Sequence, residues 1–301
     1  NLPLTQTQTG RVTKGAAQAL LGKVYLYQNK FALAAPVLDD VISSGVYDLV
    51  ADYSTLFEND NENSIESVFE IQYTDVEGAG FGCLQCSEGN VAIGFNGPRN
   101  FNGPLFESGF SFNVPTQEVF DAFDQDDARR EFAILDIVAF AQANTDFNGG
   151  AGVTFTEGFE HTGYFNRKYI PRVGDTNIGD QNLTNPGNYR AIRFADVLLM
   201  GAEAHNQGDG NDALAREYLN RVRERTTLSD VNASGSALTQ AIYNERRLEL
   251  VGEGHHFFDL VRTGRAAQEI EGFTAGKNEL FPIPLVEIQL AGNRWLQNPG
   301  Y

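Results

Sequence analysis

The segment NERRLELVGEGHHFFDLVRTGR, residues 244–265, contains four carboxylates, two adjacent histidines and four arginines. Apolar residues recur at helical spacing on its N-terminal side, and Glu245 falls on the same face as Leu238, Ile242 and Leu248. An unpaired carboxylate on a buried face is strongly destabilising, so Glu245 requires a basic partner. The segment therefore predicts a helix that a buried ion pair locks to its neighbours.

Arg193, Arg223 and Arg262 are the candidate partners of Glu245. A perturbed catalytic acid is the functional alternative, but an arginine lowers the pKa of a neighbouring carboxyl and makes it a poor general acid. The two histidines are sequence neighbours, which do not face one metal ion on a regular element. The segment is therefore interpreted as scaffold, and we predict no catalytic residue, no metal site and no cofactor.

Two amphipathic segments lie near the start of the chain. Residues 11–28 predict a helix with Thr13 as its N-cap, and residues 31–45 predict a second helix after a two-residue turn. The apolar residues that share one face of the first helix are Ala16, Leu20, Val24 and Tyr27. Two helices joined by so short a turn form an antiparallel pair.

The same arrangement returns in the second half of the chain. Gly22 and Ala34, twelve positions apart, match the packing pattern of tetratricopeptide repeats, and Gly201 and Ala213 repeat that spacing. A further helix is expected over about 237–251. The sequence therefore predicts a mainly α fold, a tetratricopeptide-like helical superhelix.

The segment between these helix pairs, about 64–188, has a different composition. Residues 66–74 alternate like a strand, and glycine, asparagine and phenylalanine then recur at short intervals. A long insert in a compact scaffold usually carries function. We therefore predict a single domain, 1–301, with a helical scaffold over about 10–63 and 189–301. The insert would be an irregular, loop-rich ligand face containing short strands.

Charge and hydropathy exclude two classes of partner. The formal net charge is −18, and a field of that sign repels phosphate backbones, so nucleic-acid binding is not expected. No stretch approaches the roughly 18 consecutive apolar residues of a membrane helix. Acidic loops such as DQDDARR lack the spacing of a calcium loop and are interpreted as solvated surface.

Cys83 and Cys86 are the only cysteines and form one C-x-x-C motif in a glycine-rich context. The motif is compatible with a redox pair, half a zinc site, two free thiols or a short-range disulfide. No histidine lies near it in sequence, and the surrounding glycines do not predict a helix that it would open. We favour a structural disulfide that holds the loop in an oxidising compartment.

Several motifs together resemble those of the SusD/RagB family. They are GRVTKGAAQALLGKVYLYQNKFALAAPVLDDVISSGVYDL, ENSIESVFEIQY, RFADVLLMGAEA, LNRVRERT, the opening segment, LFPIPLVEI and the final QNPGY. The resemblance covers nearly the whole chain and corresponds to the middle and C-terminal part of the family. The family's N-terminal part, with its lipid-bearing cysteine, is absent, and Cys83 and Cys86 lie too far along the chain to be that anchor.

The resemblance implies a helical superhelix that carries an irregular ligand-binding face. Family members are surface lipoproteins of Bacteroidota, on the extracellular face of the outer membrane. They capture glycans, and in some cases peptides, and act with a SusC-like TonB-dependent transporter as binders rather than enzymes. Membrane attachment would be through a lipid anchor that this chain does not contain.

A sugar-binding face needs flat rings that stack on pyranose faces and polar groups that bond hydroxyls. The candidate ligand contacts in the insert are Phe81, Phe95, Asn96, Arg99, Asn100, Phe101, Asn102, Tyr164 and Asn166. The alternative for the phenylalanines is that they pack as small cores that anchor the loops. The sole tryptophan, Trp295, lies outside the insert and is interpreted as a packing residue.

Three alternatives to glycan capture stay open. An insert without tryptophan is compatible with a peptide ligand instead of a glycan. A helical-repeat protein that binds only other proteins would use its concave helical surface. A glycan hydrolase would need two carboxylates about 5–9 Å apart across a cleft.

Overall fold

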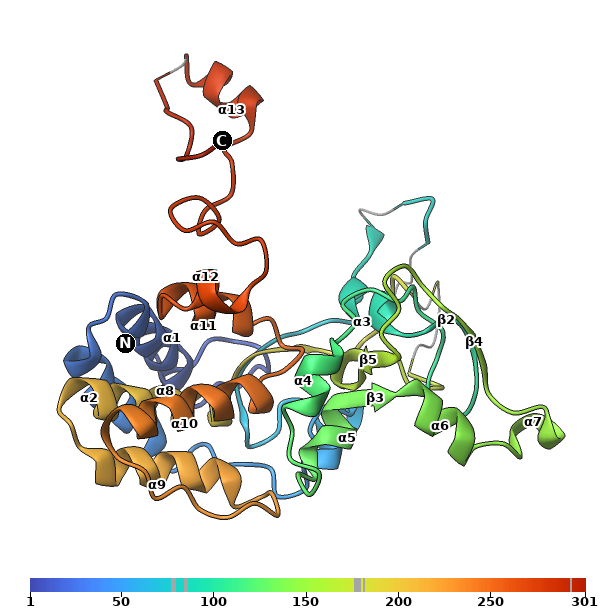
Figure 1. Cartoon of the computed structure of the whole chain (residues 1–301), viewed down its shortest axis with the longest axis horizontal. Helices are drawn as coiled ribbons and strands as arrows, with labels where there is room; N and C mark the ends of the chain where they lie inside the picture. Colours follow the sequence, from blue (N-terminus) through green and yellow to red (C-terminus); the bar gives the residue numbers. More distant parts are fainter. Residues whose placement is uncertain (77–79, 84–85, 176–179, 181, 293) are drawn as a thin grey trace. The chain divides into compact units, whose positions relative to one another are not determined.

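The computed structural model describes residues 1–76, 80–83, 86–175, 180, 182–292 and 294–301. The chain separates into two compact units, Asn1–Glu253 and Gly254–Tyr301. Helices are the main regular structure in both units, although loops make up much of the second, and short strands occur in the first (Figure 1). The predicted mainly α fold with short strands is confirmed.

Five longer helices form the scaffold of the first unit. They are α1 (Lys14–Tyr27), α2 (Phe31–Ile42), α8 (Phe194–Gly208), α9 (Asp212–Arg223) and α10 (Gly235–Glu249). Thr13 caps α1 as predicted, because its Oγ1 accepts a hydrogen bond of 3.1 Å from the amide of Ala16. Helix α2 packs on both α1 and α8, and α8 also packs on α9 and α10, which is the predicted tetratricopeptide-like stacking.

Small residues set the distance between α1 and α2. A Cβ added to Gly22 would lie 2.5 Å from Cδ2 of Leu38, so only glycine allows this approach. Ala34 of α2 is fully buried. The predicted role of this glycine–alanine pair in close helix packing is confirmed.

The buried face of α1 differs from the predicted one. Ala16 is buried, but Leu20, Val24 and Tyr27 are exposed. The buried residues of α1 are Gly15, Ala16, Ala19, Gly22 and Leu26. Close packing against α2 selects the face with the smallest side chains, and the larger apolar residues are turned outward. The prediction from hydrophobic periodicity was wrong here because it ignored side-chain volume.

Within the described ranges, strands pair in three antiparallel two-stranded sheets. The strands are β1 (Ser67–Ile71) with β6 (Tyr189–Arg193), β2 (Arg99–Asn102) with β4 (Thr154–Thr156), and β3 (Ile134–Asp136) with β5 (Tyr164–Asn166). The first pair joins the two ends of the predicted insert, with Ile71 opposite Tyr189. The insert therefore leaves the scaffold and returns to it at one place.

The insert also contains short helices and its own apolar clusters. The helices are α3 (Val91–Asn96), α4 (Gln117–Asp121), α5 (Arg129–Ala133), α6 (Ile137–Ala143) and α7 (Phe147–Gly150), with a 3-10 turn at Arg167–Tyr169. One cluster consists of Phe101, Phe106, Leu135, Ile137, Phe165 and Ile170. Two further 3-10 turns, Tyr53–Thr55 and Asn59–Asn61, precede β1.

Two chain segments of the insert cross at a pair of glycines. A Cβ on Gly109 would lie 2.5 Å from the backbone nitrogen of Gly97, and the amide of Gly109 donates to Pro98 O at 3.0 Å. The obstacle is backbone, which cannot rotate away as a side chain can. This crossing fixes the loops that follow β2.

The C-terminal unit contains α11 (His256–Arg262), α12 (Ala266–Glu269) and α13 (Leu285–Leu290). Within it, the hydroxyl of Tyr301 donates to Leu280 O at 3.0 Å. Trp295 is 54% exposed, so its interpretation as a packing residue was wrong. Among the residues that the structure describes in either unit, no helix is both long enough and apolar enough to span a bilayer.

Candidate functional site

A buried network of ion pairs, here called the ion joint, connects the insert to the scaffold. Its members are Glu66, Asp127, Arg129, Lys168, Arg193, Arg225, Glu245, Glu249 and Glu253. Arg129 and Lys168 come from the insert, whereas Glu245 and Glu249 lie on α10. The joint therefore fixes where the insert sits on the helices.

Glu249 is the centre of the ion joint. Its carboxylate is fully buried and accepts hydrogen bonds of 2.9 Å from both Arg129 and Arg193, and a third bond from Arg225. Burial alone would raise the pKa of Glu249, but Arg225, Arg193 and Arg129 outweigh it and hold that pKa well below its usual range. Glu249 is therefore an ionised structural carboxylate with no proton to give at neutral pH.

Glu245 lies on the buried face of α10, as its position in the helix predicted, and pairs with Arg223 at 2.7 Å. Its other partner is Arg129, which sequence reasoning did not propose. Arg193 instead pairs with other carboxylates of the joint, because β6 places it beside Glu249. Arg262 lies in the C-terminal unit, where its Nε donates to Asp259 at 2.7 Å.

Lys168 attaches the insert to the end of α10. Its Nζ donates to Glu253 Oε1 at 2.7 Å and to Glu249 O at 2.8 Å. Burial lowers the pKa of Lys168 to about 8, and the nearby Glu253 only partly opposes this. Asn166 makes a second attachment of the insert to the residues after α10, since its Nδ2 donates to Gly252 O at 2.8 Å.

Four of the predicted ligand contacts are buried. They are Asn96, Phe101, Tyr164 and Asn166. The Phe101 ring packs with the rings of Phe106 and Phe140, and Tyr164 stacks on Phe120 with ring centroids 4.3 Å apart. These side chains stabilise the insert itself, and the structure gives them no surface that could meet a ligand. Burial argues against the predicted ligand contact at these four positions, and the site proposed below does not include them.

The other predicted contacts reach solvent. Phe81, Arg99, Asn100 and Asn102 are exposed, and Phe95 is half-buried. Three of them lie on β2, where Asn100 Nδ2 also donates to Thr156 Oγ1 on β4 at 3.2 Å. The Nη2 of Arg99 donates to Phe110 O at 3.2 Å, which holds the guanidinium against that loop.

Phe95 belongs to a cluster of phenylalanine rings. Its ring meets those of Phe110 and Phe112 edge to face, with centroids 5.1 and 5.7 Å away. The amides of Phe110 and Phe112 both donate to Phe95 O at 3.1 Å, so the backbone fixes the rings relative to one another. The guanidinium of Arg99 lies over the Phe110 ring, 5.6 Å from its centroid. Phe112 is the outermost ring of the cluster, 55% exposed.

A second exposed ring comes from the loop between β4 and β5. Phe159 is 89% exposed. Its neighbour Gly158 lies against Ser111, the neighbour of Phe112, because a Cβ on Gly158 would come 2.7 Å from Ser111 Cβ. The two loops therefore touch beside their exposed rings. We call Phe95, Arg99, Phe110, Phe112 and Phe159 the aromatic face.

Backbone strain accompanies the aromatic face. Ser111 and Glu160 have φ values of 59° and 53°, in the left-handed region. This conformation is unfavourable by about 1–2 kcal/mol for an L residue, and such residues concentrate at functional sites. Sequence reasoning did not single out Phe110, Phe112 or Phe159. The available signal was their position in loops rich in Gly, Ser and Asn.

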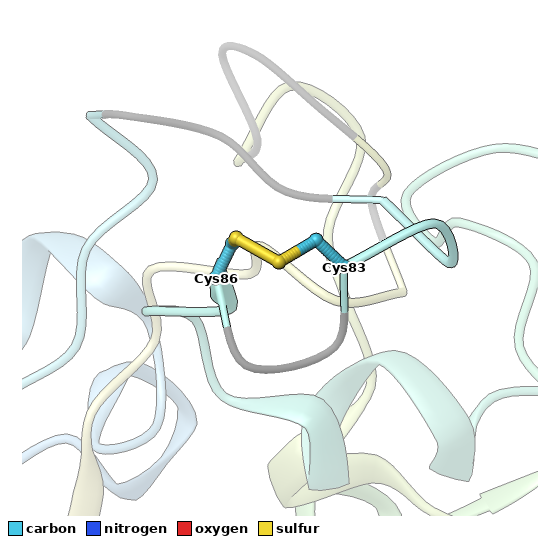
Figure 2. Close-up of a disulfide and its surroundings, with 2 residues drawn as sticks. All are labelled: Cys83 and Cys86. Carbon is cyan, nitrogen blue, oxygen red and sulfur yellow. A yellow bond between two sulfur atoms is a disulfide. The ribbon is translucent and has the colours of Figure 1, made fainter.

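A disulfide joins Cys83 to Cys86 (Figure 2). Both residues are exposed, and Phe81 precedes them by two positions. The bridge is the short-range disulfide favoured from the sequence, and it excludes two free thiols and half a zinc site in this structure. Within the described residues, no group of three or more His, Cys, Asp or Glu side chains is placed to hold a metal ion.

Comparison with known proteins places these features in a family. A model of the SusD family matches residues 49–279. The chain belongs to the SusD family. The family relationship predicted from the sequence motifs is thereby confirmed.

Relatives in this family include proteins described as glycan binders. A structure described as a laminarin binding SusD-like protein is 40% identical, with a TM-score of 0.88, and the match covers 100% of this chain and 66% of that one. Surface glycan-binding protein A from Bacteroides thetaiotaomicron, in complex with laminarihexaose, is 29% identical, with a TM-score of 0.89 and coverage of 99% and 66%.

Curated relatives of this chain are likewise described as SusD-like proteins. SusD-like protein P2 of Formosa agariphila is 28% identical over an alignment of 326 positions, which covers 100% of this chain and 62% of the relative. The chain therefore spans somewhat less than two-thirds of the length of the relatives that it matches first.

Proposed function

We propose that this chain captures a glycan at the cell surface through its aromatic face. The observation that carries the proposal is the pair of exposed rings, Phe112 and Phe159, on loops that contact each other. Exposed flat rings stack on pyranose faces, while nearby Arg99, Asn100 and Asn102 can bond hydroxyl groups. Two similar structures are described by the glycans that they bind, laminarin and laminarihexaose, and this supports a glucan as the first ligand to test.

The proposed protein is a binder and not an enzyme. It would present the glycan on the extracellular face of the outer membrane and deliver it to a SusC-like TonB-dependent transporter. The family supports this arrangement. The disulfide supports a location in an oxidising compartment. Membrane attachment would be through a lipid anchor.

Alanine substitution of the two exposed rings tests the glycan proposal. Phe112→Ala and Phe159→Ala should each weaken binding of laminarin oligosaccharides about tenfold, because each removes one stacking surface. Isothermal titration calorimetry measures the affinity. Phe281→Ala is the matched control, since Phe281 is 83% exposed but lies in the C-terminal unit.

Unchanged affinity in both ring variants would exclude the aromatic face as the glycan site. Binding of peptides, with no glycan bound, would replace the glycan by a peptide ligand. Release of shorter oligosaccharides during incubation would contradict the assignment as a binder. Delivery is tested separately, by co-purification of the protein with a TonB-dependent transporter from outer membranes.

A further inference from the structure

A hollow lies between the insert and the segment that precedes β1, and its lining differs from that of the aromatic face. It has a volume of about 430 Å³ and is lined by Glu58, Leu105, Phe106, Arg167, Arg172 and Val173. We call it the arginine pocket. Its walls are two chain segments that are held together by backbone hydrogen bonds, from Glu107 N to Pro171 O at 2.8 Å and from Val173 N to Leu105 O at 3.0 Å. The pocket is therefore preformed.

The two arginines of the pocket are not equivalent. Arg172 is paired with Glu58, to which its Nη2 donates at 2.9 Å and its Nε at 3.2 Å. Arg167 has no such partner: in the part of the chain that the structure describes, no carboxylate oxygen lies within 4.0 Å of its guanidinium nitrogens. The pocket therefore holds two positive charges against one negative charge.

The guanidinium of Arg167 keeps most of its donors free. Its Nη1 donates to Glu131 O at 2.9 Å, and its plane lies near two rings, 5.6 Å from the centroid of Phe106 and 5.0 Å from that of Phe132. Burial and the neighbouring Arg172 lower the pKa of Arg167, and the charges of Glu131 and Glu58 only partly oppose this. A half-buried cation beside a like charge is stabilised when an anion binds to it.

We propose that the arginine pocket binds an oxyanion substituent of a saccharide, either a carboxylate or a sulfate ester. The planar guanidinium of Arg167 offers parallel N–H donors that match the oxygens of either group. Phe106 is buried beneath the two guanidinium groups and holds them in place, while the exposed Leu105 and Val173 supply apolar contacts for a sugar ring at the mouth. In a chain of net charge −18, this local excess of positive charge would attract anions only at short range.

The backbone of Leu105 provides independent support for a binding role. Its φ is +70°, a left-handed conformation that is unfavourable for a leucine, and its side chain is exposed at the pocket. One part of this inference rests on the proposed function, namely that the molecule bearing the oxyanion is a saccharide. The oxyanion preference rests on Arg167 and is separate from the aromatic face.

The test compares three probes by calorimetry: a galacturonate oligosaccharide, a sulfated galactan oligosaccharide and a neutral laminarin oligosaccharide. Arg167→Gln should weaken binding of at least one of the two acidic probes by about tenfold or more, and leave neutral binding unchanged. The probe that is affected identifies the anion. Arg130→Gln is the matched control, because Arg130 also lies over a phenylalanine ring, 5.2 Å from the centroid of Phe120, but does not line this pocket.

Binding of the affected probe to the unmodified protein should also weaken as ionic strength rises, which tests the charge without any substitution. Failure of the unmodified protein to bind either acidic probe would overturn the inference, and so would equal losses in the Arg167→Gln and Arg130→Gln variants. Loss of neutral binding in the Phe112 and Phe159 variants concerns the aromatic face alone. Failure of the inference is therefore distinguishable from failure of the proposed function.

Discussion

In the ion joint, charged side chains are buried against opposite charges, whereas in the aromatic face apolar rings are open to solvent. Glu249 is fully buried among arginines, while Phe159 is almost fully exposed. Each region therefore reverses the usual burial preference of its residue types. In the ion joint, pairing with opposite charges explains why charged side chains are buried. For the aromatic face, we propose that a bound ligand covers the rings.

The comparison indicates that different regions have different roles: the ion joint positions the insert, whereas we propose that the aromatic face binds the ligand. Buried ion pairs contribute little net stability relative to apolar packing, but losing one partner is strongly destabilising. The joint is thus suited to fix the insert in one place on the helices. An exposed ring adds little to folding, so it can be altered with small effect on stability.

Glu249→Gln is expected to have the largest effect. It removes the central charge and leaves three arginines near a neutral side chain, which should lower the free energy of unfolding by about 3–5 kcal/mol. Urea denaturation measures it. Glu224→Gln, at an exposed carboxylate that follows α9, should change that free energy by less than about 0.5 kcal/mol. Equal effects in the two variants would mean that the joint does not hold the insert.

Lys168→Met should change how stability depends on pH. The pKa of Lys168 is about 8 in the folded protein and 10.5 in an unperturbed lysine, so the unfolded chain binds more protons between these values. The contribution of Lys168 to stability therefore rises with pH in this window, by up to about 1.4 kcal/mol per pH unit. The variant lacks this rise.

Urea denaturation at pH 7, 8, 9 and about 10 measures the difference between wild type and variant, ending where unfolded tyrosines begin to ionise. Lys30→Met, at an exposed lysine, is the control and should keep the wild-type slope. A parallel pH profile for Lys168→Met and wild type would show that Lys168 is not desolvated in the folded protein.

Gly109→Ala should affect the insert and spare the helices. The added methyl would meet the backbone of Gly97, which should destabilise the insert by about 1–3 kcal/mol and displace the rings that follow it. Glycan affinity should fall while the helical circular dichroism signal stays. Gly80→Ala, where a methyl would meet no atom within 4 Å, is the control. Full retention of glycan affinity in Gly109→Ala would show that the crossing of Gly97 and Gly109 does not position the aromatic face.

The sequence was sufficient to predict features that depend on residues close together along the chain. Thr13 as an N-cap, Gly22 at a close helix contact and Glu245 on a buried face all follow from local spacing. Arg129 could not be found in this way, because it lies 116 positions before Glu245 in an acidic segment. Only the folded chain brings the two together.

Composition was insufficient to locate the ligand face. Phe101 and Phe159 occur in similar glycine-rich surroundings, yet one is buried and the other exposed. The difference depends on which loop contacts which, as at Gly158 and Ser111. Those contacts are long-range and leave no periodic pattern in the sequence.

The bridge between Cys83 and Cys86 also offers a way to observe binding. These are the only two cysteines in the chain, and both are exposed. Mild reduction would therefore free one pair of thiols, and a dye with two thiol-reactive groups could span them without any substitution. Such a dye would lie two positions from Phe81, within the insert. Its fluorescence would report events at that loop in an otherwise natural chain.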